Sequence, residues 1–164
     1  MEEWGLLGGD VKPNNKNMNT SNEMLDSIEL SHLLCKIDAQ IKNIESGDAH
    51  KQIGNMMNFP LKLKIDYSDL RKEAIKELYG MLYKAFNLIC KIILETNNKI
   101  VVSVVNKSCL QIINLLSSSY LNIQKVPMVK PLADLYNEAK INLQKNCNDS
   151  LISDMDKLSN KLFV

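Results

Sequence analysis

The chain has little arginine, glycine and proline, and each scarcity argues against a class of protein. Arg71 is the only arginine. Because bidentate contacts to guanine and phosphate rely on guanidinium groups, and no basic run is interleaved with aromatics, we expect no nucleic-acid partner. Six glycines and four prolines are too few for a turn-rich β-sandwich. The net charge of +1 provides no overall field that would attract an acidic partner.

A secretory leader and a long uninterrupted apolar run are also missing. Residues 1–10 carry acids where a leader needs positive charges. The longest apolar region, residues 88–116, is interrupted by Lys91, Glu95 and Lys99, so we expect no transmembrane helix and no membrane partner. These observations predict a cytoplasmic or nuclear protein.

Motifs for catalysis and metal binding are absent. The four cysteines are widely spaced, form no C-x-x-C pair and fall in apolar helical settings, which predicts structural thiols: Cys35, Cys90, Cys109 and Cys147. His32 lies one turn before a cysteine, but His50 alone remains to complete a zinc site. No glycine-rich phosphate loop occurs. We therefore predict no metal, no cofactor, no evident small-molecule substrate and no enzymatic activity.

What the sequence does contain is the apolar spacing of amphipathic helices. The segment Thr20–Glu23 matches a capping box, and the first helix is expected to end at Gly47. The further predicted helices run from Asp48 to before Pro60, from Asp66 or Ser68 to Asn97, from Ile100 for about eighteen residues, from Pro131 through Leu143, and from Asn148 or Asp149 to the C-terminus.

Two segments of the chain have a less helical composition. Residues 61–65 alternate apolar and lysine residues, but this strand pattern has no partner, so we predict an extended connector. The β-branched block Ile100–Val105 favours a strand by composition and a helix by spacing and length, and we predict a helix. The fold class is therefore all-α: a single-domain helical bundle of five to six helices over residues 20–164, after a disordered tail over residues 1–19.

The N-terminal tail carries one motif with a known binding mode. The sequence Glu2-Glu3-Trp4-Gly5-Leu6-Leu7 resembles the short peptide that ubiquitin-like autophagy modifiers bind. The resemblance covers six residues and implies that Trp4 and Leu7 enter two pockets while the peptide adds a strand to a sheet edge. The alternative is that Trp4 packs on the bundle or has no binding role.

The middle of the chain has more apolar surface than a bundle of this size encloses easily. Residues 88–94 and 101–116 are apolar in nearly every direction of two consecutive helices. A 164-residue bundle can surround one such helix more easily than two. We therefore expect an exposed apolar patch or groove on the second helix, with Val102, Val105 and Ile113 binding a partner.

Three hypotheses for function follow from these features. The leading one is a non-enzymatic helical protein-protein interaction module, an adaptor or subunit of a larger assembly, whose partner is another protein or a second copy. The alternative is a groove-bearing regulator of the Bcl-2 type, in which amphipathic helices surround an apolar central hairpin and bind a partner's helix. The third is a small cysteine-dependent enzyme, in which one of the thiols meets a histidine.

Overall fold

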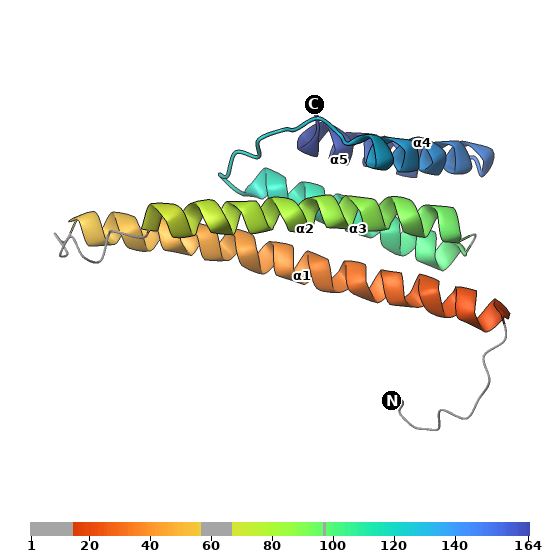
Figure 1. The fold of residues 1–164 in the computed structure, drawn as a ribbon, viewed down its shortest axis with the longest axis horizontal. Coiled ribbons are helices and arrows are strands. Elements are labelled where there is room, and N and C mark those ends of the chain that lie inside the picture. The colour runs from red at the N-terminus through yellow and green to blue at the C-terminus, as the bar shows by residue number, and fades with distance from the viewer. Residues whose placement is uncertain (1–14, 57–66, 97) are drawn as a thin grey trace, which may run out of the picture.

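The computed structural model describes residues 15–56, 67–96 and 98–164, and over these ranges the chain folds as an all-α bundle (Figure 1). This confirms the predicted fold class. The described ranges contain five helices: α1 (Asn15–Met56), α2 (Tyr67–Glu95), α3 (Lys99–Ser118), α4 (Lys130–Lys145) and α5 (Asp149–Leu162).

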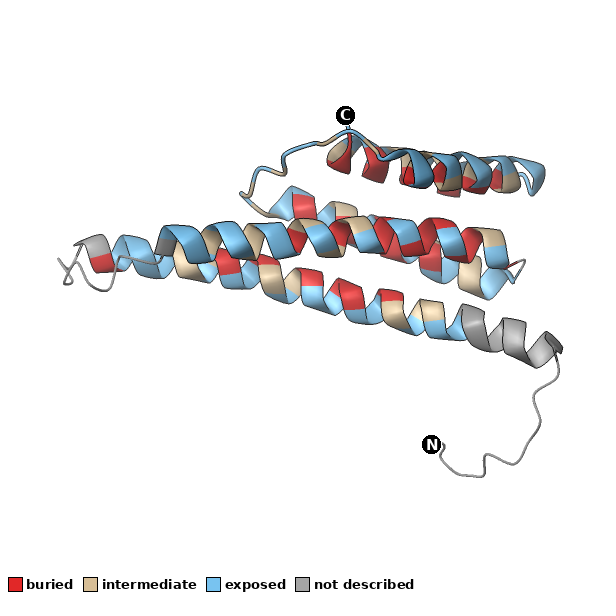
Figure 2. Cartoon of the chain, viewed as in Figure 1, coloured by how far each residue is buried: buried red, intermediate tan, exposed pale blue. Residues whose placement is uncertain are grey.

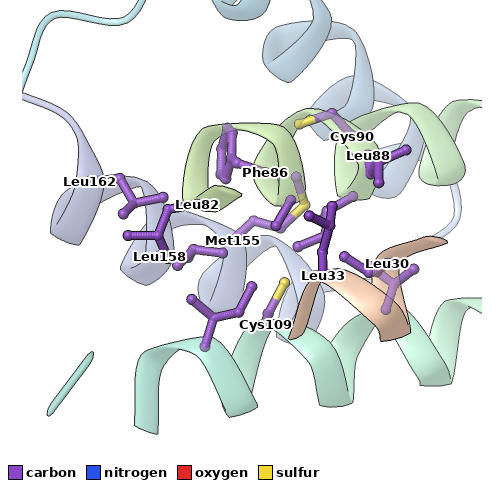
Figure 3. Packing of buried hydrophobic residues seen from close by; sticks show 14 of the residues in the cluster. Leu30, Leu33, Leu82, Phe86, Leu88, Cys90, Cys109, Met155, Leu158 and Leu162 are labelled. Atoms are coloured by element: carbon purple, nitrogen blue, oxygen red, sulfur yellow. The ribbon is translucent and has the colours of Figure 1, made fainter. Parts of the chain in front are cut away.

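The helix α2 is the centre of the bundle. It packs against all four other helices: in Figure 1, α1 lies below it, the α4–α5 hairpin lies above it, and α3 lies behind it, in contact with both α1 and α5. Within the described ranges, α2 supplies half of the largest fully buried side chains: Leu78, Leu82, Phe86, Ile89, Ile92 and Ile93. Figure 3 shows two of them, Leu82 and Phe86, in one cluster with residues of α1, α3 and α5, among them Leu30, Cys109 and Met155. One continuous core therefore holds the five helices.

The first helix is longer than predicted at both ends. It begins at Asn15, so the prediction of a start at Thr20 is wrong, and residues 15–19, assigned to the tail, are helical. The predicted break at Gly47 is also wrong, because α1 continues through it. Asp48 does not cap a new helix; its carboxylate accepts two hydrogen bonds from Arg71, at 2.8 and 3.1 Å. This tertiary contact offsets part of the roughly 1 kcal/mol that a mid-helix glycine costs.

The remaining helices begin largely where their capping residues predict. Asn98 accepts a hydrogen bond from the Ile100 N–H at 2.9 Å, and the β-branched block Ile100–Val105 is helical, as predicted. Asn148 caps α5 by accepting from the Leu151 N–H at 3.3 Å. The predicted connector at residues 61–65 lies outside the described residues.

The C-terminal residues form backbone hydrogen bonds with the loop between α3 and α4. Val126 and Phe163 form a parallel β-bridge, and the Val164 N–H donates to the Val126 carbonyl at 3.0 Å. The Phe163 ring lies 5.4 Å from that of Phe86 and 5.5 Å from that of Tyr83, measured between centroids. The loop therefore closes over the aromatic end of the core.

Candidate functional site

The exposed side of α3 carries apolar side chains that nothing in the described structure covers. Ile100 is 74% exposed, Leu110 41% and Val104 37%. Lys107 lies among them, and the whole helix contains no acidic residue. This side of α3 is therefore apolar with positive charge only.

A second exposed stripe lies on the neighbouring helix α1. Met24 is 60% exposed and Ile28 46%, and Cys35, also exposed, follows at the same helical phase. The helices α1 and α3 are in contact and run in the same direction (Figure 1), and Ser119 after the end of α3 donates to Glu45 at 3.3 Å. Ile28 and Val102 each lie 17 residues before the two residues of this hydrogen bond. Because both helices rise 1.5 Å per residue, Ile28 and Val102 lie at about the same height along the bundle. We call the exposed residues Met24, Ile28, Ile100, Val104, Lys107 and Leu110 the α1–α3 face.

The partner-binding residues predicted on α3 occupy three different environments. Val105 is fully buried in the core, so its side chain presents no surface to a partner. Ile113 is half-buried and packs against the core. Val102 is half-buried and lines a cavity at the end of the bundle. Trp4 and Leu7 lie outside the described residues.

By length and composition, α3 could cross a membrane, and among the described residues it is the one helix that could. The sequence predicts no such segment, because Lys91, Glu95 and Lys99 interrupt the apolar run over residues 88–116. In the structure Lys99 is the first residue of α3 rather than an interruption inside it. Here α3 packs against α1, α2 and α5, and 28% of its most apolar stretch is buried.

A cavity of about 470 Å³ opens at the end of the bundle where the α2–α3 turn meets the α4–α5 turn. Its apolar lining comes from Ile93, Val102, Leu143 and Leu151. Its polar lining comes from Thr96, Lys99, Ser103, Asn106, Asn142, Asn146, Cys147 and Asn148. Among the described residues that line it, Lys99 is the only charged one.

Most polar side chains around this cavity are used to build the two turns. Asn142 donates to the Ile93 carbonyl at 3.1 Å and so ties α4 to α2. Asn146 donates to the carbonyl and the side chain of Asn142, at 3.1 and 2.9 Å. Thr96 accepts from the Asn98 N–H at 2.9 Å. Asn106 differs, because its Oδ1 is buried and has no hydrogen-bond partner.

All four cysteines are free, and they divide into two pairs. Cys90 and Cys109 are buried as predicted, whereas Cys35 lies exposed on α1 and Cys147 lies exposed in the α4–α5 turn. The apolar setting predicted for these last two is therefore wrong. Cys147 has a backbone φ of 55°, a left-handed conformation that is uncommon for a residue with a side chain. Among the described residues, no hydrogen bond joins either exposed thiol to a histidine.

Burial changes the acidity of the two core thiols. It raises the pKa of Cys90 from its ordinary value of 9.0 to about 12, with a smaller contribution from Cys109. It raises the pKa of Cys109 likewise to about 12, with a smaller contribution from Asp154. Neither core thiol is therefore available as a nucleophilic thiolate at neutral pH.

The raised thiol pKa values predict a loss of stability in alkaline solution. Between about pH 9 and pH 12 the unfolded chain has lost thiol protons that the folded protein keeps, so rising pH favours unfolding. Urea unfolding at pH 7.5 and pH 10 measures this slope. The variant Cys90→Ala should reduce the slope and Cys35→Ala should leave it unchanged; equal slopes in all three proteins would contradict the assignment.

Neither a metal-binding cluster in the described residues nor a known relative indicates a function. Within the described ranges, no group of three or more histidine, cysteine or acidic side chains is arranged to hold a metal ion. No protein-family model, curated protein or solved structure matches the chain. The candidate sites are therefore argued from their own geometry.

Proposed function

We propose that the protein is a non-enzymatic helical interaction module, an adaptor or subunit that binds an acidic amphipathic helix of a protein partner along the α1–α3 face. The single observation that carries this proposal is the exposure of Ile100, Val104 and Leu110 on a helix that is otherwise as apolar as a core element. Exposed apolar patches on soluble bundles commonly mark interaction surfaces.

The charges on α3 favour an acidic partner. Lys107 lies within the apolar residues, Lys99 stands at the start of the helix, and no acid occurs between Lys99 and Ser118. A partner helix with an apolar stripe flanked by aspartate or glutamate would bury its stripe on the face and place its acids near these ammonium groups. A lysine-flanked helix would meet like charges.

The other two hypotheses find less support. In the groove-bearing arrangement α2 and α3 would form a central hairpin surrounded by the other helices, but α3 keeps an exposed side. The cysteine-dependent enzyme would need a thiolate beside a histidine, and the core thiols hold their protons. Self-association would use the same α1–α3 face, and a measurement of the molecular mass in solution distinguishes it from binding of another protein.

A matched pair of designed peptides tests the proposal. Both carry the same leucine stripe on a helix of about five turns, one flanked by glutamate and the other by lysine. Fluorescence polarisation should give the glutamate peptide an affinity at least about tenfold higher than the lysine peptide. The variant Ile100→Glu should weaken this binding by about tenfold or more, since it removes apolar contact and adds repulsion.

The control variant is Ile141→Glu, which changes an isoleucine on α4 that is also exposed. It should bind the glutamate peptide as the unaltered protein does. The peptide should also protect Cys35 on α1 from alkylation. Equal binding of both peptides, or equal loss with both variants, would overturn the proposal. Light scattering coupled to gel filtration tests self-association. A dimer would have twice the mass of one chain, and the Ile100→Glu variant would return to the mass of one chain.

A further inference from the structure

The α1–α3 face has a candidate occupant in the chain itself. The chain enters α1 at Asn15, and residues 1–14 before it lie outside the described residues. In Figure 1, α1 and α3 begin at the same end of the bundle, so residues 1–14 join the described structure near the start of this face. They include the sequence Glu-Glu-Trp-Gly-Leu-Leu at positions 2–7, which we call the acidic tail motif.

The acidic tail motif has the properties that we propose for a partner of this face, namely apolar side chains next to acids. Its apolar side chains are Trp4, Leu6 and Leu7, and the two residues before them are glutamates. Ile100, which is 74% exposed, and Val104, which is 37% exposed, offer an aliphatic surface to such side chains. Burial on that surface is favourable, and an aromatic ring contributes the largest area.

The charges around the face also favour this motif. Two acids of α1 at the height of the face pair with lysines of α2: Glu29 with Lys84 at 3.1 Å, and Asp26 with Lys91 at 3.7 Å. On α3, which contains no acid, Lys107 forms no ion pair with any of the described residues. Glutamates from outside the described structure would therefore find an unpaired ammonium group within the face.

The chain before α1 is long enough to place the motif on the face. Val104 lies at the height of the fifteenth residue after Asn15, roughly 22 Å along the bundle and about 25 Å away once the roughly 10 Å between helix axes is included. Leu7 and Trp4 precede Asn15 by eight and eleven residues, which span up to about 26 Å and 36 Å when extended. Pro13 is a residue common in turns, and a turn there would direct the motif back along α1.

We propose that the acidic tail motif occupies the α1–α3 face of its own chain, with its apolar side chains on Ile100 and Val104 and its glutamates beside Lys107, and that an external partner has to displace it. The displacement rests on the proposed function; the occupancy does not. A tethered segment has an effective concentration of about 1 mM, so a contact with a Kd of about 0.1–1 mM fills the face in roughly half to nine-tenths of the molecules.

Trp4 provides a specific reporter, because it is the only tryptophan in the chain. The test is acrylamide quenching of tryptophan fluorescence in the full chain. The Stern–Volmer constant of the unaltered protein should be at least about twofold lower than that of Ile100→Glu, because a motif docked in half or more of the molecules shields that fraction of the indoles. The control Ile141→Glu, an exposed isoleucine on α4, should match the unaltered protein. Equal quenching in the unaltered protein and Ile100→Glu would overturn the inference.

Two further measurements locate the contact. The quenching constant should stay the same over about a hundredfold range of protein concentration; a decrease with concentration would mean that a second copy supplies the motif and would overturn the intramolecular contact. Lys107→Glu should weaken docking about twofold, and exchanging Glu2 and Glu3 for lysine in the same chain should restore it. Absence of this rescue would overturn the placement of the glutamates.

Peptide binding separates this inference from the proposed function. Trp4→Ala should raise the affinity for the glutamate-flanked peptide by about twofold to tenfold, because it removes a competitor from the face. Equal affinity in the two proteins would overturn the displacement. If the peptide binds neither protein but the quenching contrast is present, the proposed function fails and the occupancy stands. If the peptide binds both equally and the quenching contrast is absent, this inference fails and the proposed function stands.

Discussion

Replacing Phe86 with alanine is expected to destabilise the protein by about 3–5 kcal/mol, the usual loss for a buried aromatic ring. Phe86 is fully buried, and its ring lies 5.2 Å from that of Tyr136 and 5.4 Å from that of Phe163. The substitution therefore leaves a hole where α2, α4 and the C-terminal residues meet. Thermal unfolding followed by circular dichroism should give a Tm lower by on the order of 10 °C.

The control for this prediction is Leu70→Ala, also on α2 but 66% exposed. It should change the free energy of unfolding by less than about 0.5 kcal/mol. Phe86→Leu, which keeps part of the apolar volume, should fall between the two. A loss below about 1 kcal/mol for Phe86→Ala would mean that the aromatic end of the core is not packed as described.

Two neighbouring valines on α3 should respond in opposite ways to lysine. Val105 is fully buried, so Val105→Lys would place an unpaired ammonium group in the core and is expected to unfold the protein. Val104 is 37% exposed on the α1–α3 face, so Val104→Lys should change the free energy of unfolding by about 0.5 kcal/mol or less. Urea unfolding and far-ultraviolet circular dichroism measure both.

The pair tests the rotational setting of α3 in the bundle. If Val104→Lys also unfolds the protein, then the α1–α3 face is covered in solution, and the melting temperature of the unaltered protein should depend on its concentration. If Val105→Lys folds normally, then α3 is rotated from the orientation described. The expected contrast is several kcal/mol between adjacent residues.

Much of this fold could be predicted because its signals are local. The spacing of apolar residues predicts α2 to α5, and Asn148 marks the start of α5 by the same hydrogen bond that the structure contains. For the β-branched block Ile100–Val105, spacing and length outweighed composition, because α3 buries Val105 and Ile112 on one side.

The predicted helix boundaries are wrong where a contact between residues far apart in the sequence determines the structure. Gly47 and Asp48 together form a plausible boundary between helices, but Arg71, 23 residues away, holds Asp48 by two hydrogen bonds and α1 continues. Local spacing contains no information about that ion pair. The helix begins at Asn15, five residues before Thr20, because the capping-box pattern that predicts a first turn at Thr20 lies inside the helix.

The candidate sites were predictable only in part. The excess of apolar residues on α3 predicts an uncovered surface, but Val105 and Val104 differ by one position, and their roles depend on the rotation of the helix against α1 and α5. The cavity depends on two turns about fifty residues apart, tied by the bond from Asn142 to Ile93. Neither turn alone contains a recognisable motif, so this site emerges only from the tertiary structure.

The hairpin of α1 and α2 extends well beyond the α4–α5 layer, and its outer part is largely exposed (Figure 2). Ile53 and Leu70 lie there with half or more of their surface in solvent. Near this outer part, Asp48 of α1 accepts hydrogen bonds from Arg71 of α2 and from Tyr120 in the loop after α3. Asp48 therefore connects three segments of the chain. The described residues beyond this junction are largely exposed, so we expect this end of the α1–α2 pair to open before the core does.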